Sequence, residues 1–126
     1  MPYIEVKTTT VLSTEKKREL SQKLIAAFGK VSSKEVAANI QMAVVDGCWM
    51  NFRGDVDSPT AHILVCPGPL TPLEDYRRII DAFFPILVKE LKTKKDHIYI
   101  NILEFQNWGY DGEMVAVPKQ HDNSNQ

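Results

Sequence analysis

Residues that build metal centres and disulfide frameworks are scarce in this sequence. Its 126 residues include two cysteines, Cys48 and Cys66, and three histidines, His62, His97 and His121. The cysteines are too far apart for a Cys-x-x-Cys motif, and the histidines show no metal-ligand spacing. We therefore expect no metal, no disulfide framework and no cofactor.

Excess charge and long apolar runs are also missing. Fifteen Lys and Arg residues stand against 16 Asp and Glu, which gives a net charge of −1, and the pI is about 6.3. This balance gives no reason to expect a nucleic-acid or anionic-membrane partner. No segment approaches the roughly 18 apolar residues of a membrane span, and the N-terminus lacks a basic stretch followed by an apolar run. The sequence predicts a cytoplasmic enzyme or binding protein whose function comes from a local site.

The first third of the chain has the pattern of a β-α-β unit. Residues 2–8 alternate as a strand does, and Ser13 or Thr14 then caps a helix that ends at Gly29. Residues 36–45 are mostly apolar and rich in strand-forming side chains. We expect them to form the second strand of the unit.

The second half repeats this order. Residues 61–66 form a short apolar run, stopped by the Pro-Gly-Pro segment 67–69. A helix is predicted to begin near Thr71, with Pro72 at its first position and a kink or break at Pro85. Residues 97–105 then alternate as a strand, with Tyr99 and Asn101 on one face.

The two halves match in spacing as well as in order. Pro2 to Ile40 is 38 positions and Ala61 to Ile100 is 39. We predict an α+β, two-layer fold, in which two fused β-α-β units (2–45 and 61–105) form a four-stranded mixed sheet with two helices on one face. One domain is predicted over residues 1–117, followed by a disordered polar tail at 118–126. The other sheet face is expected to be apolar and therefore covered by oligomerisation.

Pro2 is the most informative single residue. If Met1 is removed, Pro2 becomes a secondary amine fixed at the start of a strand. An α-amino group has a pKa of about 8, and an apolar pocket or a nearby cation would lower that pKa toward neutrality. Such an amine suits proton transfer at neutral pH. A rigid, protease-resistant chain start is the alternative interpretation of the same residue.

Over residues 2–110 the sequence resembles the tautomerase superfamily, in its macrophage migration inhibitory factor and D-dopachrome tautomerase branch. The resemblance rests on Pro2, on Gly29-Lys30 after the first helix, on the loop at residues 50–54 and above all on Tyr-Ile-Asn at residues 99–101. It implies a trimer of doubled β-α-β chains whose sheets form the inside of a barrel-like assembly. It also implies keto–enol conversion of 2-oxo acids such as phenylpyruvate, with Pro2 as general acid and base.

The resemblance assigns further roles residue by residue. Lys30 would hold the substrate carboxylate, although the following residues lack the family's Pro-rich turn, so that Lys34 is an alternative and an ordinary solvated lysine is another. Tyr99 and Asn101 would reach the site from the neighbouring subunit, so the active sites would lie at subunit interfaces. Tyr99 would donate a hydrogen bond to the enolate oxygen, and Asn101 would orient the substrate or Tyr99. Buried sheet positions with satisfied polar groups are the alternative interpretation of both residues.

Two more positions complete the predicted site. Trp108, with Phe105, would form an apolar wall, although both could equally be core residues. The family usually presents a backbone N–H before the second helix, and Gly68 is the substitute here because Pro67 and Pro69 cannot donate.

Two other functions stay open. Relatives that dehalogenate or decarboxylate substrates use the same proline with added arginines, and Arg53 is the one loop arginine suited to that role. A non-enzymatic, cytokine-like binding protein is the other alternative, and retention of Met1 would favour it because an acylated proline nitrogen is not a base.

Overall fold

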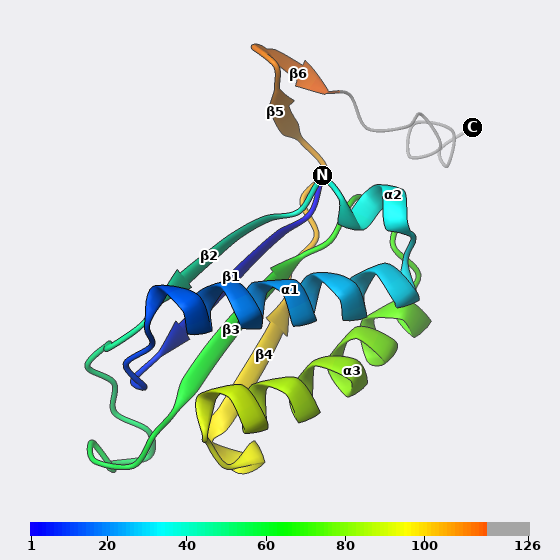
Figure 1. The fold of residues 1–126 in the computed structure, drawn as a ribbon. Helices are drawn as coiled ribbons and strands as arrows, with labels where there is room; N and C mark the ends of the chain where they lie inside the picture. Colours follow the sequence, from blue (N-terminus) through cyan, green and yellow to red (C-terminus); the bar gives the residue numbers. More distant parts are fainter. Residues whose placement is uncertain (116–126) are drawn as a thin grey trace.

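The computed structural model describes residues 1–115, so the predicted polar tail at 118–126 lies outside the described residues. Two long helices lie side by side across one face of a four-stranded sheet, and a small hairpin projects beyond one end of it (Figure 1). The elements in chain order are β1 (Tyr3–Thr8), α1 (Thr14–Val31), α2 (Lys34–Ala37), β2 (Gln41–Val45), β3 (Ala61–Cys66), α3 (Leu73–Leu91), the 3-10 turn η1 (Lys95–His97), β4 (Ile98–Ile102), β5 (Trp108–Tyr110) and β6 (Glu113–Val115).

The sheet consists of two parallel strand pairs, which are joined edge to edge by the antiparallel pairing of β1 with β3. Its order is β2-β1-β3-β4, with β1 parallel to β2, β3 parallel to β4, and β1 antiparallel to β3. Each helix connects the strands of its own pair, which is the β-α-β order predicted from the sequence. The α+β fold with a mixed sheet and two main helices is therefore confirmed, whereas the trimer stays a prediction.

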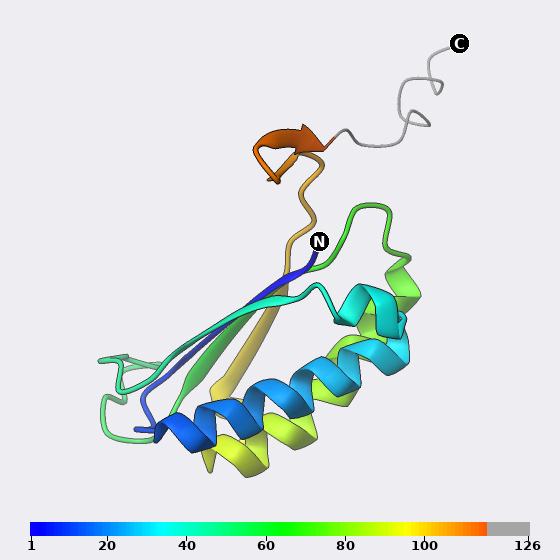
Figure 2. The same cartoon turned by 45° about the horizontal axis from the view of Figure 1, so that its top comes forward.

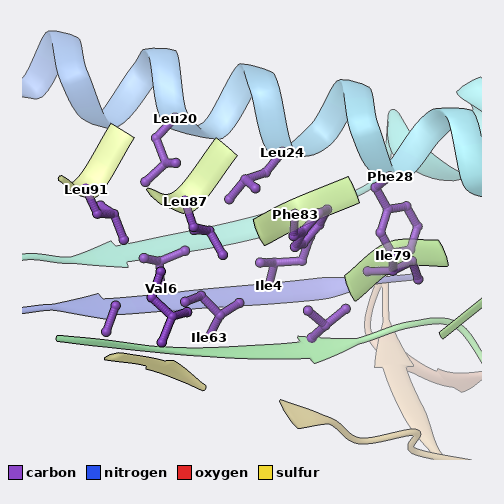
Figure 3. Packing of buried hydrophobic residues seen from close by; sticks show 13 residues of the cluster. Ile4, Val6, Leu20, Leu24, Phe28, Ile63, Ile79, Phe83, Leu87 and Leu91 are labelled. Atoms are coloured by element: carbon purple, nitrogen blue, oxygen red, sulfur yellow. The ribbon is translucent and has the colours of Figure 1, made fainter. Parts of the chain in front are cut away.

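The core fills the space between the two helices and the sheet. Every third or fourth residue of α1 and α3 points toward the sheet, and alternate residues of β1 and β3 point back (Figure 3). The fully buried side chains of this layer include Ile4, Val6, Leu20, Leu24, Phe28, Ile63, Ile79, Phe83, Leu87 and Leu91.

Three local predictions differ from the structure: the start of the second strand, the end of the first helix and a break at Pro85. Residues 36 and 37, predicted to begin the second strand, belong instead to α2, because the Ser33 side chain accepts a hydrogen bond from the Val36 N–H and caps a short helix. The helix α1 passes Gly29 and ends at Val31. A Cβ at Gly29 would lie 3.1 Å from the Cβ of Ala37, so glycine there allows α2 to approach closely. The helix α3 runs unbroken through the exposed Pro85.

The helix-free face of the sheet is more polar than expected. The valines and isoleucines of the sheet mostly turn toward the helices, and Figure 2 shows the opposite face without a covering layer. On that face the Tyr3 hydroxyl donates to Glu5 at 2.9 Å, and the Lys7 ammonium lies 3.6 Å from the same carboxylate. The apolar surface exposed on the helix-free face therefore supports oligomerisation less strongly than the sequence pattern suggested.

Candidate active site

A pocket of about 600 Å³ opens at the end of the sheet where β1 begins. Pro2 is buried in its wall, and three segments far apart in the sequence meet there: the chain start, the turn before β2 and the strand β5. We call it the Pro2 pocket. Its lining residues are Met1, Pro2, Tyr3, Asn39, Gln41, Trp108, Gly109, Tyr110 and Asp111.

The start of β1 is fixed by the neighbouring strand. The Gln41 N–H donates to the Pro2 carbonyl at 3.1 Å, one step before the β1–β2 ladder begins with Tyr3 opposite Gln41. Burial lowers the pKa of the Met1 α-amino group below its ordinary value. This end of the chain is therefore a partly desolvated environment for an amine.

Two aromatic residues of β5 help to line the Pro2 pocket. The Trp108 indole N–H donates to the Phe105 carbonyl at 3.0 Å, and the two rings meet edge to face at 6.0 Å between centroids. Trp108 thus lies in one pocket with Pro2, and Tyr110 from the same strand joins it.

The loop after β3 brings Gly68 close to the chain start. A Cβ built on Gly68 would lie 3.9 Å from the Met1 nitrogen. Glu104 anchors this loop, because its carboxylate accepts hydrogen bonds from the Leu70 N–H and the Tyr76 hydroxyl, each at 2.5 Å. Gly68 itself lines a smaller neighbouring pocket, of about 230 Å³.

Tyr99 and Asn101 lie on the helix-free face of β4, as the alternation predicted, and Tyr99 is far from Pro2 of the same chain. Tyr99 pairs with His62 and His62 with Lys7. Lys7 is five residues along β1 from Pro2, which corresponds to about 16 Å along the strand. The Tyr99 ring is 54% exposed and packs against Phe52 at 5.3 Å between centroids.

Neither candidate lysine lines the Pro2 pocket. Lys30 is exposed in the last turn of α1 and borders an outer groove between α1 and α3. Lys34 is exposed at the start of α2. Among the described residues that line the Pro2 pocket, Asp111 is the one charged side chain.

Comparison with known proteins decides the family. The sequence matches the family model described as macrophage migration inhibitory factor (MIF) over residues 1–116. The chain belongs to the MIF family. The resemblance drawn from Pro2 and the Tyr-Ile-Asn segment is thereby confirmed.

Solved structures agree with the MIF fold at low sequence identity. Leishmania major MIF2 is 19% identical, with a TM-score of 0.76 over 91% of this chain and 97% of its own. The MIF-like protein of Entamoeba histolytica has the same identity and TM-score over 90% and 98%. A third structure, Pt0534 inactivated by 2-oxo-3-pentynoate, is also 19% identical, with a TM-score of 0.76 over 88% and 93%. The comparison with curated proteins gives no match.

Several residues of the Pro2 pocket in this MIF-family chain escaped sequence reasoning. Tyr110 lies two positions after Trp108 on β5, so the aromatic pair was visible in the sequence, although the hairpin was not predicted. Asn39 and Gln41 reach the pocket because α2 shortens the expected strand and places a turn before β2. No sequence pattern indicated that turn.

Residues 1–115 contain neither a candidate metal-binding group of side chains nor a helix able to span a membrane. No group of three or more His, Cys, Asp or Glu side chains there could hold a metal ion. The helices of this part of the chain also lack the combination of length and apolar character that crossing a membrane requires.

The Tyr76–Glu104 contact should be visible in a high-pH titration. The hydrogen bond to Glu104, with burial and the carboxylate charge, raises the pKa of Tyr76 to about 12. A raised pKa stabilises the fold below the ordinary tyrosine pKa of about 10, and this stabilisation is lost as pH rises through the folded value. The unfolding free energy should therefore fall more steeply with pH in wild type than in Tyr76→Phe, measured by urea unfolding between about pH 10 and 12. Equal slopes would contradict the assignment.

Proposed function

We propose that this MIF-family chain is a keto–enol tautomerase of small 2-oxo acids such as phenylpyruvate, with Pro2 as general acid and base after removal of Met1. The observation that carries the proposal is the burial of Pro2 in the wall of a pocket that Trp108 and Tyr110 also line. An aromatic pocket suits an aryl side chain and limits water around the amine.

The proposed chemistry needs only a proton carrier and a hydrogen-bond donor. The Pro2 nitrogen takes a proton from the carbon next to the ketone, and the electron pair of that C–H bond forms the enolate. The protonated amine then returns the proton to the oxygen, which gives the enol, and the reverse sequence regenerates the ketone. Desolvation at the start of β1, which lowers the pKa of the Met1 amine, would also favour the neutral, basic form of a Pro2 amine.

The hydrogen-bond donor for the enolate is proposed to come from another copy of the chain. The register leaves Tyr99 about 16 Å along the strand from Pro2 of its own chain. Its exposure on the helix-free face supports a role toward a neighbouring subunit. We therefore propose a homotrimer with active sites at the subunit interfaces, in which Asn101 of the neighbour also contacts the substrate. A solution mass of three chains is the expected result.

The family resemblance implies two further substrate contacts, a backbone N–H at Gly68 and a lysine for the carboxylate. The proximity of the Gly68 loop to the Met1 nitrogen supports a backbone N–H contact there. For the carboxylate we keep Lys30, with Lys34 as the alternative, on the family resemblance alone, since no lysine lines the Pro2 pocket within the described part of one chain. The variant with the larger rise in KM, Lys30→Ala or Lys34→Ala, identifies the group.

The dehalogenase and decarboxylase alternative gains no support from the site. Arg53 stands 5.0 Å over the Phe52 ring, in the loop beside Tyr99, and no arginine is among the described residues lining the Pro2 pocket. Retention of Met1 would favour the cytokine-like alternative, because an acylated proline nitrogen is not a base.

The experiment for the proposed function is enol-to-keto conversion of phenylpyruvate, followed by ultraviolet absorbance. The protein is first checked by mass spectrometry to begin at Pro2. Conversion clearly faster than in buffer is expected. Conversion at the buffer rate by such protein would contradict phenylpyruvate tautomerisation and point to another substrate class or a non-enzymatic role.

A further inference from the structure

On the helix-free face, a hydrogen bond joins His62 to Asn101, which is one of the predicted substrate contacts. His62 on β3 and Asn101 on β4 are diagonal neighbours on adjacent strands, and His62 Nε2 hydrogen-bonds Asn101 Oδ1. A carbonyl oxygen can only accept, so His62 Nε2 carries the proton and donates. Within residues 1–115 this is the one hydrogen bond found for either side chain.

The contact determines which end of the Asn101 amide is left for a ligand. An unpaired asparagine can turn either its oxygen or its NH₂ group outward. With the oxygen held by His62, the NH₂ group is the end that faces away. Because a 2-oxo acid and its enolate present oxygen acceptors, a fixed NH₂ group binds them and a fixed oxygen would repel them.

We propose that His62 is a positioning residue that holds the Asn101 amide with its NH₂ group toward the 2-oxo acid. The inference rests on the proposed function, because it assigns Asn101 to the substrate. His62 acts through Asn101 and need not contact the substrate itself. A His62–Asn101 pair that only stabilised the sheet would affect unfolding but not the KM for a 2-oxo acid.

Two variants of His62 separate these roles. Gln places an N–H donor close to the position of Nε2, whereas Leu of similar volume has no donor. We expect His62→Leu to raise the KM for phenylpyruvate roughly tenfold, the effect of one hydrogen bond to a charged ligand. We expect His62→Gln to stay within about twofold of wild type, and kcat to change less than KM in both variants.

A double-mutant cycle tests whether His62 works through Asn101. In an Asn101→Ala background His62→Leu should have little further effect, because the group it positions is absent. Two effects that simply add would show that His62 acts separately from Asn101 and would overturn the inference. The inference is also overturned if both His62 variants match wild type while Asn101→Ala is impaired.

Covalent labelling by 2-oxo-3-pentynoate gives a readout that does not depend on turnover. The Pro2 nitrogen would bond to the alkyne carbon distal to the ketone, and the neighbouring carbon would take up a proton, so no group leaves and no co-reactant is needed. At low reagent concentration the labelling rate, followed by intact mass, should fall in His62→Leu and be retained in His62→Gln.

The outcomes keep the two proposals apart. Pro2-dependent activity and labelling that are the same in wild type and His62→Leu overturn the inference and leave the proposed function standing. A wild-type protein that begins at Pro2 and shows neither activity nor labelling removes the proposed function, and the role of His62 with it.

Discussion

Replacing Pro2 by glycine should lower kcat/KM for phenylpyruvate by about a hundredfold to ten-thousandfold. This is the usual contribution of a positioned general acid–base. Glycine keeps an α-amino group but loses the ring that fixes the nitrogen in the wall of the pocket, where Pro2 is buried. The measurement is steady-state ketonisation by protein whose N-terminus has been verified by mass.

A matched proline outside the site supplies the control. Pro85 is exposed within α3 and does not line the Pro2 pocket, so Pro85→Ala should leave kcat/KM within about twofold of wild type. A Pro2→Gly variant that kept more than about half of the wild-type rate would contradict a catalytic role for the proline.

Replacing Phe83 by alanine should destabilise the fold by about 3–5 kcal/mol. Phe83 is fully buried on α3, in the layer where both helices pack on β1 and β3 (Figure 3). Truncation removes the transfer free energy of the ring and leaves a cavity that the rigid sheet cannot fill. Urea unfolding at matched protein concentration measures the loss, because assembly would make the apparent stability depend on concentration.

The control for Phe83 lies on the same helix. Leu73 is 78% exposed at the start of α3, so Leu73→Ala should change the unfolding free energy by less than about 0.5 kcal/mol. Similar losses in the two variants would mean that burial does not determine the stability of this helix.

The strands β1 and β4 were predictable because apolar and polar side chains alternate along them, whereas the hairpin of β5 and β6 was not predicted. In β1, for instance, Ile4 and Val6 are fully buried while Lys7 is exposed. The short helix α2 was not predictable from apolar pattern, because its residues look equally suitable for a strand. Local capping by Ser33 decided the structure there.

Only part of the candidate site was predictable from the sequence, because some of its contacts depend on a turn and on strand register. Pro2 and Trp108 were both named from the sequence, and they line one pocket. Asn39 depends on the turn after α2, and the His62–Asn101 contact depends on the register between β3 and β4. Neither can be deduced from one sequence, since a shift of register by one residue would turn these side chains to the other face.

The most direct test of Pro2 as the base compares two forms of the same chain, one that begins at Pro2 and one that retains Met1. All side chains from residue 2 onward are identical in the two forms. The Pro2 nitrogen is a secondary amine in one and an amide in the other, and the second form also carries Met1, which lines the Pro2 pocket. The account predicts phenylpyruvate tautomerisation by the form that begins at Pro2 and conversion near the buffer rate by the form that retains Met1. Equal activity of the two forms would contradict it.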